Sequence, residues 1–196
     1  MIRDSVEILN GLTNYANPDM KLKRMVEDKA LYRLRRGMYA TDKNIATYLL
    51  AGAIYGPSYV SFETALSLHG LIPERVFGCT SATYDKNRSK VFRNEIGTFY
   101  YRDVPKAIYH VGVKWQQENG MGYALATPEK AICDMLYIQK PVFSKKALKE
   151  LLFDDLRINE EDLRNLDATD IVTLAPYYKK RNLLFLSKIM EERRCV

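Results

Sequence analysis

The sequence lacks the features that mark membrane-spanning, secreted and disulfide-linked proteins. No apolar run approaches the roughly 18 to 20 residues that a membrane span needs, and the first residues carry Asp4 and Glu7 where a signal peptide would be apolar. The three cysteines, Cys79, Cys133 and Cys195, form no CxxC pair and are odd in number, which argues against a disulfide framework. We therefore expect a cytoplasmic protein with reduced thiols and no membrane partner.

The chain is also poor in motifs for catalysis and for cofactor or metal binding. Its two histidines, His69 and His110, have no serine, cysteine or acidic partner at a recognisable motif spacing. The Gly120-Met121-Gly122 stretch lacks a correctly placed third small residue, and a strand is expected after it, so it is not a dinucleotide-binding loop. P-loop and metal-ligand spacings are missing as well. We expect no enzymatic activity, no cofactor and no metal site.

A metal-dependent nuclease is the enzyme class with a superficial match. Pro18-Asp19 and Glu27-Asp28-Lys29 resemble the acidic and lysine elements that hold Mg²⁺ and an attacking water in such enzymes. That chemistry places its carboxylates on a sheet edge facing a phosphate, whereas these residues fall on one short expected helix surrounded by positive charge. We attribute the match to chance.

What the chain does have is positive charge near its start. Of 196 residues, 30 are Lys or Arg and 24 are Asp or Glu, a net charge of +6. Residues 1–43 hold 9 basic and 6 acidic side chains, and from 21 to 36 the balance is 7 to 2. A cluster of this kind is typical of a surface that binds phosphates, although an ordinary solvated face produces the same pattern.

Local signals in the same segment predict a helix followed by a hairpin. Asn17 is a good side-chain cap and Pro18 suits the first helical position, so we expect a helix from 18 to about 29 with an apolar stripe. Residues 31–34 and 38–40 read as two short strands around a turn that contains Gly37. A helix followed at once by a basic hairpin is the pattern of a winged helix.

In such a module the helix enters the major groove and the hairpin, or wing, follows the DNA backbone. The residues that we expect to contact DNA are therefore basic side chains of these two elements. The helix supplies Lys21, Lys23 and Arg24, and the hairpin supplies Arg33, Arg35 and Arg36.

The rest of the chain predicts a larger mixed domain. Helices are expected at 45–55, from a cap at Ser61 to Gly70, and at 126–137 with Thr127 as the cap. Strands are expected between 75 and 126, with Asn119-Gly120 as a hairpin turn between two extended stretches. Four short helices are expected after Pro141, and their candidate caps are Ser144, Asn159 and Asp167 or Thr169. The fold class is therefore α+β, with a small, abbreviated winged-helix module at 1–43. A mixed α/β domain at 44–196 has a strand-rich middle and a helical C-terminal tail from about 141 to 196.

Two stretches and their order resemble a known family. GPSYVSFETALSLHGL at 56–71 and ATPEKAICDML at 126–136 follow a basic hairpin that ends in RRGMY. This order is similar to that of the AbiE-type antitoxins (AbiEi) of type IV bacterial toxin-antitoxin systems, which act in phage abortive infection. The resemblance covers about residues 13–140, and its two longer stretches are more specific than the hairpin.

The resemblance implies a function with two parts. The N-terminal winged helix of such an antitoxin binds double-stranded DNA upstream of its own operon as a transcriptional autorepressor. The C-terminal domain neutralises a nucleotidyltransferase-like toxin encoded beside it, by countering the toxin's effect, without a stable complex being required.

This sequence departs from the full winged-helix pattern in one respect. A complete module has three helices before its wing, but only 16 residues precede Asn17, which leaves room for a single helix at about 4–15. Tight DNA binding would then need a homodimer or help from the larger domain. The alternative is a protein-interaction module, or a solitary transcriptional regulator, with little or no DNA binding of its own.

Overall fold

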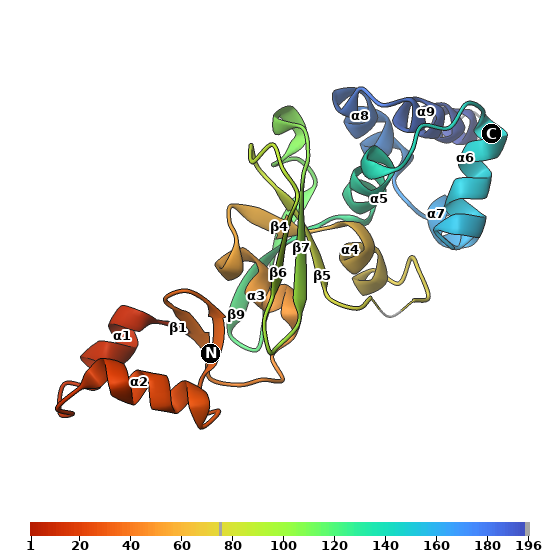
Figure 1. The fold of residues 1–196 in the computed structure, drawn as a ribbon. Coiled ribbons are helices and arrows are strands. Elements are labelled where there is room, and N and C mark those ends of the chain that lie inside the picture. Colours follow the sequence, from red (N-terminus) through yellow and green to blue (C-terminus); the bar gives the residue numbers. More distant parts are fainter. Residues whose placement is uncertain (75, 195–196) are drawn as a thin grey trace.

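The computed structural model describes residues 1–74 and 76–194, so Cys195 lies outside the described residues. The fold is mixed α+β, with two sheets among the described residues and a helical C-terminal region. Figure 1 shows three parts in chain order: a small N-terminal module, a central sheet and a group of C-terminal helices. No helix in these described stretches has the length and apolar character to cross a membrane.

The N-terminal module has the order strand, helix, helix, hairpin. Its elements are β1 (Ile2–Asp4), α1 (Ser5–Asn10), α2 (Pro18–Glu27), β2 (Tyr32–Arg35) and β3 (Met38–Ala40). The three strands form an antiparallel sheet in the order β1-β3-β2. The helix and hairpin were predicted, whereas β1 was not, and α1 is shorter than the helix expected at 4–15.

The two faces of this small sheet pack against different parts of the molecule. On one side Tyr39 joins Ile8, Leu22 and Leu31 in a small separate core with α1 and α2. Leu34 and Ala40 belong instead to the main core of the protein. Because the hairpin contributes to both cores, burial of its apolar side chains ties the module to the central sheet.

The central sheet consists, within the described residues, of β4 (Ser58–Val60), β5 (Cys79–Thr83), β6 (Lys90–Arg93), β7 (Thr98–Asp103), β8 (Val113–Glu118) and β9 (Met121–Ala126). Their order is β6-β7-β5-β4-β9-β8, with β5-β7 and β4-β9 parallel and the other pairs antiparallel. Strands β6 and β8 are therefore the two edges.

Helices pack against both sides of this sheet. Helix α3 (Thr47–Ile54) packs on β4 and β9 towards the N-terminal module, and α4 (Phe62–Leu68) packs on β5 and on α5 (Pro128–Ile138), towards the C-terminal helices (Figure 1). His69 ends α4, and its Nε2 lies 2.8 Å from the carbonyl oxygen of Ala126.

The C-terminal helices begin at side-chain caps that the sequence predicts. Ser144, Asn159 and Asp167 accept hydrogen bonds from the first turns of three helices. The helices of this region are α6 (Lys145–Glu150), continued by a π-helical turn η2 (Leu151–Asp155), α7 (Glu160–Arg164), α8 (Ala168–Tyr178) and α9 (Arg181–Arg194). Pro176 lies inside α8. A short 3-10 helix, η1 (Lys106–Ile108), precedes β8.

Candidate nucleic-acid interface

Helix α2 forms where its capping signals place it. The Asn17 Oδ1 accepts a hydrogen bond of 3.0 Å from the backbone N–H of Met20, and Pro18 occupies the first turn. Leu22 is buried, and Met25 and Val26 pack beside it on the small N-terminal core. The predicted apolar stripe is therefore present, and the opposite side of α2 faces solvent.

The outward side of α2 carries two of the three predicted basic residues. Lys23 and Arg24 are exposed. Lys23 lies 3.8 Å from Glu27 one turn later, but both side chains are more than half exposed, so this pair adds little stability. Lys21 lies on the flank, with its Nζ 5.1 Å from the centre of the Tyr15 ring.

The three arginines of the hairpin differ in their contacts. All three are exposed, and among the described residues Arg33 and Arg36 have no ion-pair or hydrogen-bond partner. Arg35 is different, because its Nε donates a hydrogen bond of 3.1 Å to the carbonyl oxygen of Ala53 in α3. The register shifts between Arg33 and Arg35, so a β-bulge accompanies this change of direction. Five of the six predicted cations thus surround one end of the molecule, and Arg35 points to its body.

Further contacts hold the module to the central sheet. The Lys29 Nζ lies 2.7 Å from both carboxylate oxygens of Glu95, and the Asn94 amide donates to the carbonyl oxygen of Leu34 at 3.2 Å. The helix was expected to run to about residue 29, but α2 ends at Glu27, and Lys29 follows it with a positive φ of 59°. The orientation of α2 and the hairpin is therefore set by the larger domain.

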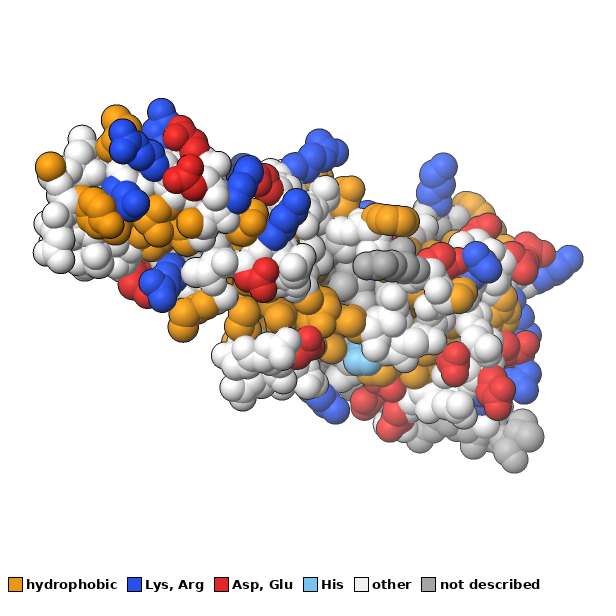
Figure 2. All heavy atoms as spheres, turned by 90° about the horizontal axis from the view of Figure 1, so that it is seen from below, with side chains coloured by type: hydrophobic (Ala, Val, Ile, Leu, Met, Phe, Trp, Pro, Cys, Tyr) orange, Lys and Arg blue, Asp and Glu red, His pale blue; other side chains and the backbone are white. Residues whose placement is uncertain are grey.

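The unpredicted strand β1 brings another cation to this end. Arg3 and Arg33 are both register partners of Tyr39, one from each side. Cross-strand partners share a sheet face, so Arg3 lies on the face that α1 and α2 cover. Figure 2 shows Lys and Arg side chains interspersed with apolar and acidic ones over this end. Strand β1 has three residues and leads directly into α1, so its alternation of polar and apolar side chains is too short to predict a strand.

A fully buried polar cluster lies far from these cations. Lys130 and Asp134 are one turn apart on α5, and the Lys130 Nζ is 2.9 Å from the Asp134 Oδ1. The hydroxyls of Tyr59 and Ser61 donate to Asp134 Oδ2 at 2.8 and 2.7 Å. The Tyr178 hydroxyl accepts from Lys130 and donates to Asp134, both at 2.6 Å. Each of these groups has a partner, as a buried charge requires.

This cluster joins β4, α5 and α8. Burial, followed by the negative charge of Asp134, raises the pKa of Tyr59 and of Tyr178 above its usual range. Ser61 was expected to cap α4, but it makes no side-chain cap and bonds to Asp134 instead. The sequence signal for the cluster is a Lys and an Asp four residues apart in α5, a spacing that an ordinary ion pair on a helix surface also has.

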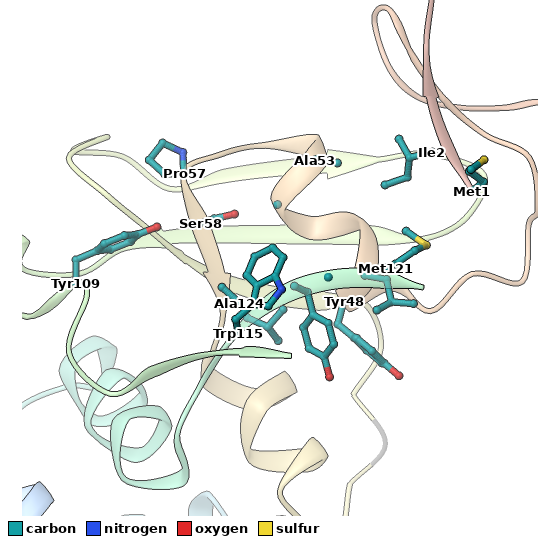
Figure 3. Close-up of a pocket in the computed structure, with 15 residues that line it drawn as sticks. Met1, Ile2, Tyr48, Ala53, Pro57, Ser58, Tyr109, Trp115, Met121 and Ala124 are labelled. Carbon is teal, nitrogen blue, oxygen red and sulfur yellow. The ribbon is translucent and has the colours of Figure 1, made fainter. Parts of the chain in front are cut away.

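A groove of about 550 Å³ separates the start of the chain from the central sheet (Figure 3). Met1, Ile2, Tyr48, Tyr109 and Trp115 are among its lining residues, and none of the described lining residues is Lys or Arg. The described lining therefore offers no lysine or arginine side chain to a phosphate group.

Acidic and histidine side chains of the described residues do not gather into a metal site. Within residues 1–74 and 76–194, no group of three or more His, Cys, Asp or Glu could hold a metal ion. Asp19 lies in the first turn of α2 and Glu27 in its last, and Lys29 is paired with Glu95. The residues that superficially match a nuclease are thus spread along one helix.

Comparison with known proteins does not assign the chain to a family. No protein-family model matches it, and no curated protein is significantly similar to it.

Proposed function

We propose that this protein is a DNA-binding antitoxin of the type IV class, which represses its own operon and neutralises a nucleotidyltransferase-like toxin. In this proposal α2 and the β2-β3 hairpin form an abbreviated winged helix that contacts double-stranded operator DNA. The larger domain carries the neutralising activity, and this part of the proposal rests on the family resemblance.

The observation that carries the DNA-binding part is the exposure of unpaired cations on two adjacent elements. Arg24 on α2, and Arg33 and Arg36 on the hairpin, have no partner among the described residues. Phosphate oxygens would satisfy their donors, and an exposed helix face flanked by a basic hairpin suits groove and backbone contacts at once. Helix α2 also lies on the side of its module that faces away from the central sheet (Figure 1).

The buried cluster gives a physical reason for the two stretches on which the resemblance rests. GPSYVSFETALSLHGL supplies Tyr59 and Ser61, and ATPEKAICDML supplies Lys130 and Asp134. These residues meet in one fully hydrogen-bonded network, so the stretches depend on each other for stability. Their co-occurrence supports a shared core architecture and does not by itself identify a toxin.

Two observations favour the alternative, a protein-interaction module or solitary regulator with little DNA binding. Arg35 donates a hydrogen bond to Ala53, so the hairpin has one donor fewer to offer to phosphate oxygens. Residues 11–17 connect α1 to α2, a longer link than the three- to four-residue turn typical of a helix-turn-helix.

Specificity for the operator tests the proposal. Lys23→Ala and Arg24→Ala should each reduce discrimination between the protein's own upstream DNA and random duplex by about 1 to 3 kcal/mol if the side chain reads a base edge. Lys188→Ala, which removes an exposed charge from α9, is the matched control. Wild-type protein that binds both duplexes equally would favour the alternative.

A further inference from the structure

Strand β8 is an open edge of the central sheet. It spans Val113–Glu118 and pairs on one side only, with β9, through six consecutive register partners without a bulge. Residues 114–117 are exposed and include no proline. A regular, exposed edge of this length presents unpaired backbone groups to another strand. Trp115, whose side chain is 73 % exposed, lies on this edge.

The hairpin turn determines which backbone groups of β8 point outward. Asn119 and Gly120 form a two-residue loop with φ values of 51° and 74°, as a type I′ turn requires. The flanking pair, Glu118 and Met121, then exchanges both hydrogen bonds, and the pattern alternates along the strand. Lys114, Gln116 and Glu118 bond to β9. Val113, Trp115 and Gln117 direct their N–H and C=O groups to the open edge.

Two features of β8 match a second, antiparallel copy of the same strand. They are the backbone groups that point to the open edge and the charges of the side chains. We propose that a second copy of this chain pairs with it, antiparallel, along β8, with the two-fold axis at Gln116. In this register Trp115 of each copy exchanges backbone hydrogen bonds with Gln117 of the other. Lys114 of each copy lies directly opposite Glu118 of the other, as a pair without backbone hydrogen bonds, in which side chains approach closely.

Neighbouring registers do not satisfy both conditions. An axis at Trp115 places Lys114 opposite Gln116, and an axis at Gln117 places Glu118 opposite Gln116, so the opposite charges are not matched. The axis at Gln116 forms two cross-strand ion pairs by symmetry and continues the sheet across the dimer.

The side chains of Lys114 and Glu118 are placed so that they can form the proposed ion pairs. Lys114 is exposed and has no partner among the described residues. Glu118 is half-buried and accepts a hydrogen bond of 3.0 Å from the Tyr48 hydroxyl, which fixes its carboxylate. The indole of Trp115 is held over Gly122, where an added Cβ would lie 2.2 Å from the Trp115 Cζ2.

This surface is distinct from the cations on α2 and the hairpin, so the proposal does not depend on DNA binding. If both hold, a two-fold dimer presents two basic modules, which suits an operator with two inverted half-sites.

Charge reversal tests the register. Sedimentation should show a dimer for the wild type, and Lys114→Glu, which places two carboxylates opposite each other twice, should weaken it about tenfold or more. The double variant Lys114→Glu/Glu118→Lys restores opposite charges and should recover the dimer. Lys188→Glu is the control with the same charge change on α9 and should have no effect. A monomeric wild type, or a dimer that Lys114→Glu leaves unchanged, would overturn the proposal.

A crosslink tests the position of the axis. In a Cys195→Ser background, Gln116→Cys should form an intermolecular disulfide on mild oxidation, because the two residues at position 116 face each other across the axis. Lys114→Cys should not, since its two copies would be about 14 Å apart along the strands, beyond the reach of a disulfide. Crosslinking at 114 but not at 116, or at neither position, contradicts the proposed pairing. Cys79 and Cys133 are buried and do not interfere.

Discussion

At the residue scale, the buried Lys130 and Asp134 are the most consequential pair outside the basic surface. Both side chains are fully buried, and removing one partner leaves the other without an opposite charge. We therefore expect Lys130→Met to lower the free energy of unfolding by about 3 to 5 kcal/mol, as measured by urea denaturation.

The double variant Lys130→Met/Asp134→Leu is the control for this prediction. It removes both charges together, and replacing a buried ion pair by apolar side chains of similar volume is often neutral. We expect it to recover only part of the lost stability, because the buried hydroxyls of Tyr59, Ser61 and Tyr178 lose their acceptor. A Lys130→Met protein as stable as the wild type would show that the ion pair is not formed in solution.

The two described cysteines give a second prediction. Cys79 and Cys133 are buried, and burial raises the pKa of the Cys79 thiol to about 12 and that of Cys133 further still. Since the thiolate is the reactive form, neither should react with a disulfide reagent near neutral pH in a Cys195→Ser background. Both should react once urea unfolds the chain. Rapid reaction of the folded protein would contradict the described burial.

Residue roles in the basic cluster follow from the sequence only in part. Lys23 and Arg24 are exposed because they lie opposite the stripe of Leu22, Met25 and Val26, which helical spacing predicts. The internal bond of Arg35 could not be predicted, because its acceptor on Ala53 belongs to another element. Long-range partners of this kind leave no local pattern.

At the element scale, the hairpin should contribute unequally to DNA binding. Arg36 has no partner among the described residues, whereas Arg35 is bonded to α3. Arg36→Ala should therefore lower affinity for any duplex and reduce the slope of log affinity against log salt by roughly one unit, the value for one lost phosphate contact. Arg35→Ala should change this slope less.

The two variants distinguish the loss of a phosphate contact from the loss of a contact that supports the hairpin. Arg35→Ala removes a contact between the hairpin and α3, so we expect it to lower thermal stability more than Arg36→Ala does. Equal salt slopes in the wild type and both variants would remove the hairpin from the DNA interface.

Elements with strong local signals were predicted well, and those without were not. The caps at Asn17, Thr127 and Ser144 mark helix starts that the structure confirms. The turn at Asn119-Gly120 is also confirmed, with both residues at positive φ. The three-residue strand β3 was predicted from the turn at Gly37, whereas the equally short β1 and β4 were missed. Their formation depends on pairing with distant strands, and sequence alternation over such lengths carries little information.

At the scale of the whole molecule, many tyrosines link stability to alkaline pH. Burial, with the neighbouring Glu118 carboxylate, raises the pKa of Tyr48 to about 12, and burial with Asp103 does the same for Tyr109. Burial and Asp134 also raise the pKa of Tyr59 and Tyr178. An unfolded tyrosine loses its proton near pH 10, so the folded state holds protons that the unfolded state releases.

Ionisation of these tyrosines should therefore lower the stability of the folded protein at alkaline pH. The stabilisation is complete below about pH 10 and should be lost as the pH rises towards about 12. Urea denaturation between neutral and alkaline pH should show falling stability, and the ultraviolet absorbance of tyrosinate should rise together with unfolding. A full tyrosinate signal from protein that remains folded would contradict the burial of these side chains.

The measurement that tests the central claim most directly is a titration of the purified protein against DNA. The duplexes are the one upstream of its own gene and a scrambled duplex of equal length, each at two salt concentrations. Preferential binding to its own upstream DNA, weakened by salt, is the result that we predict for a basic helix and hairpin that act as an operator reader. No binding, or equally weak binding to both duplexes, would contradict autorepression.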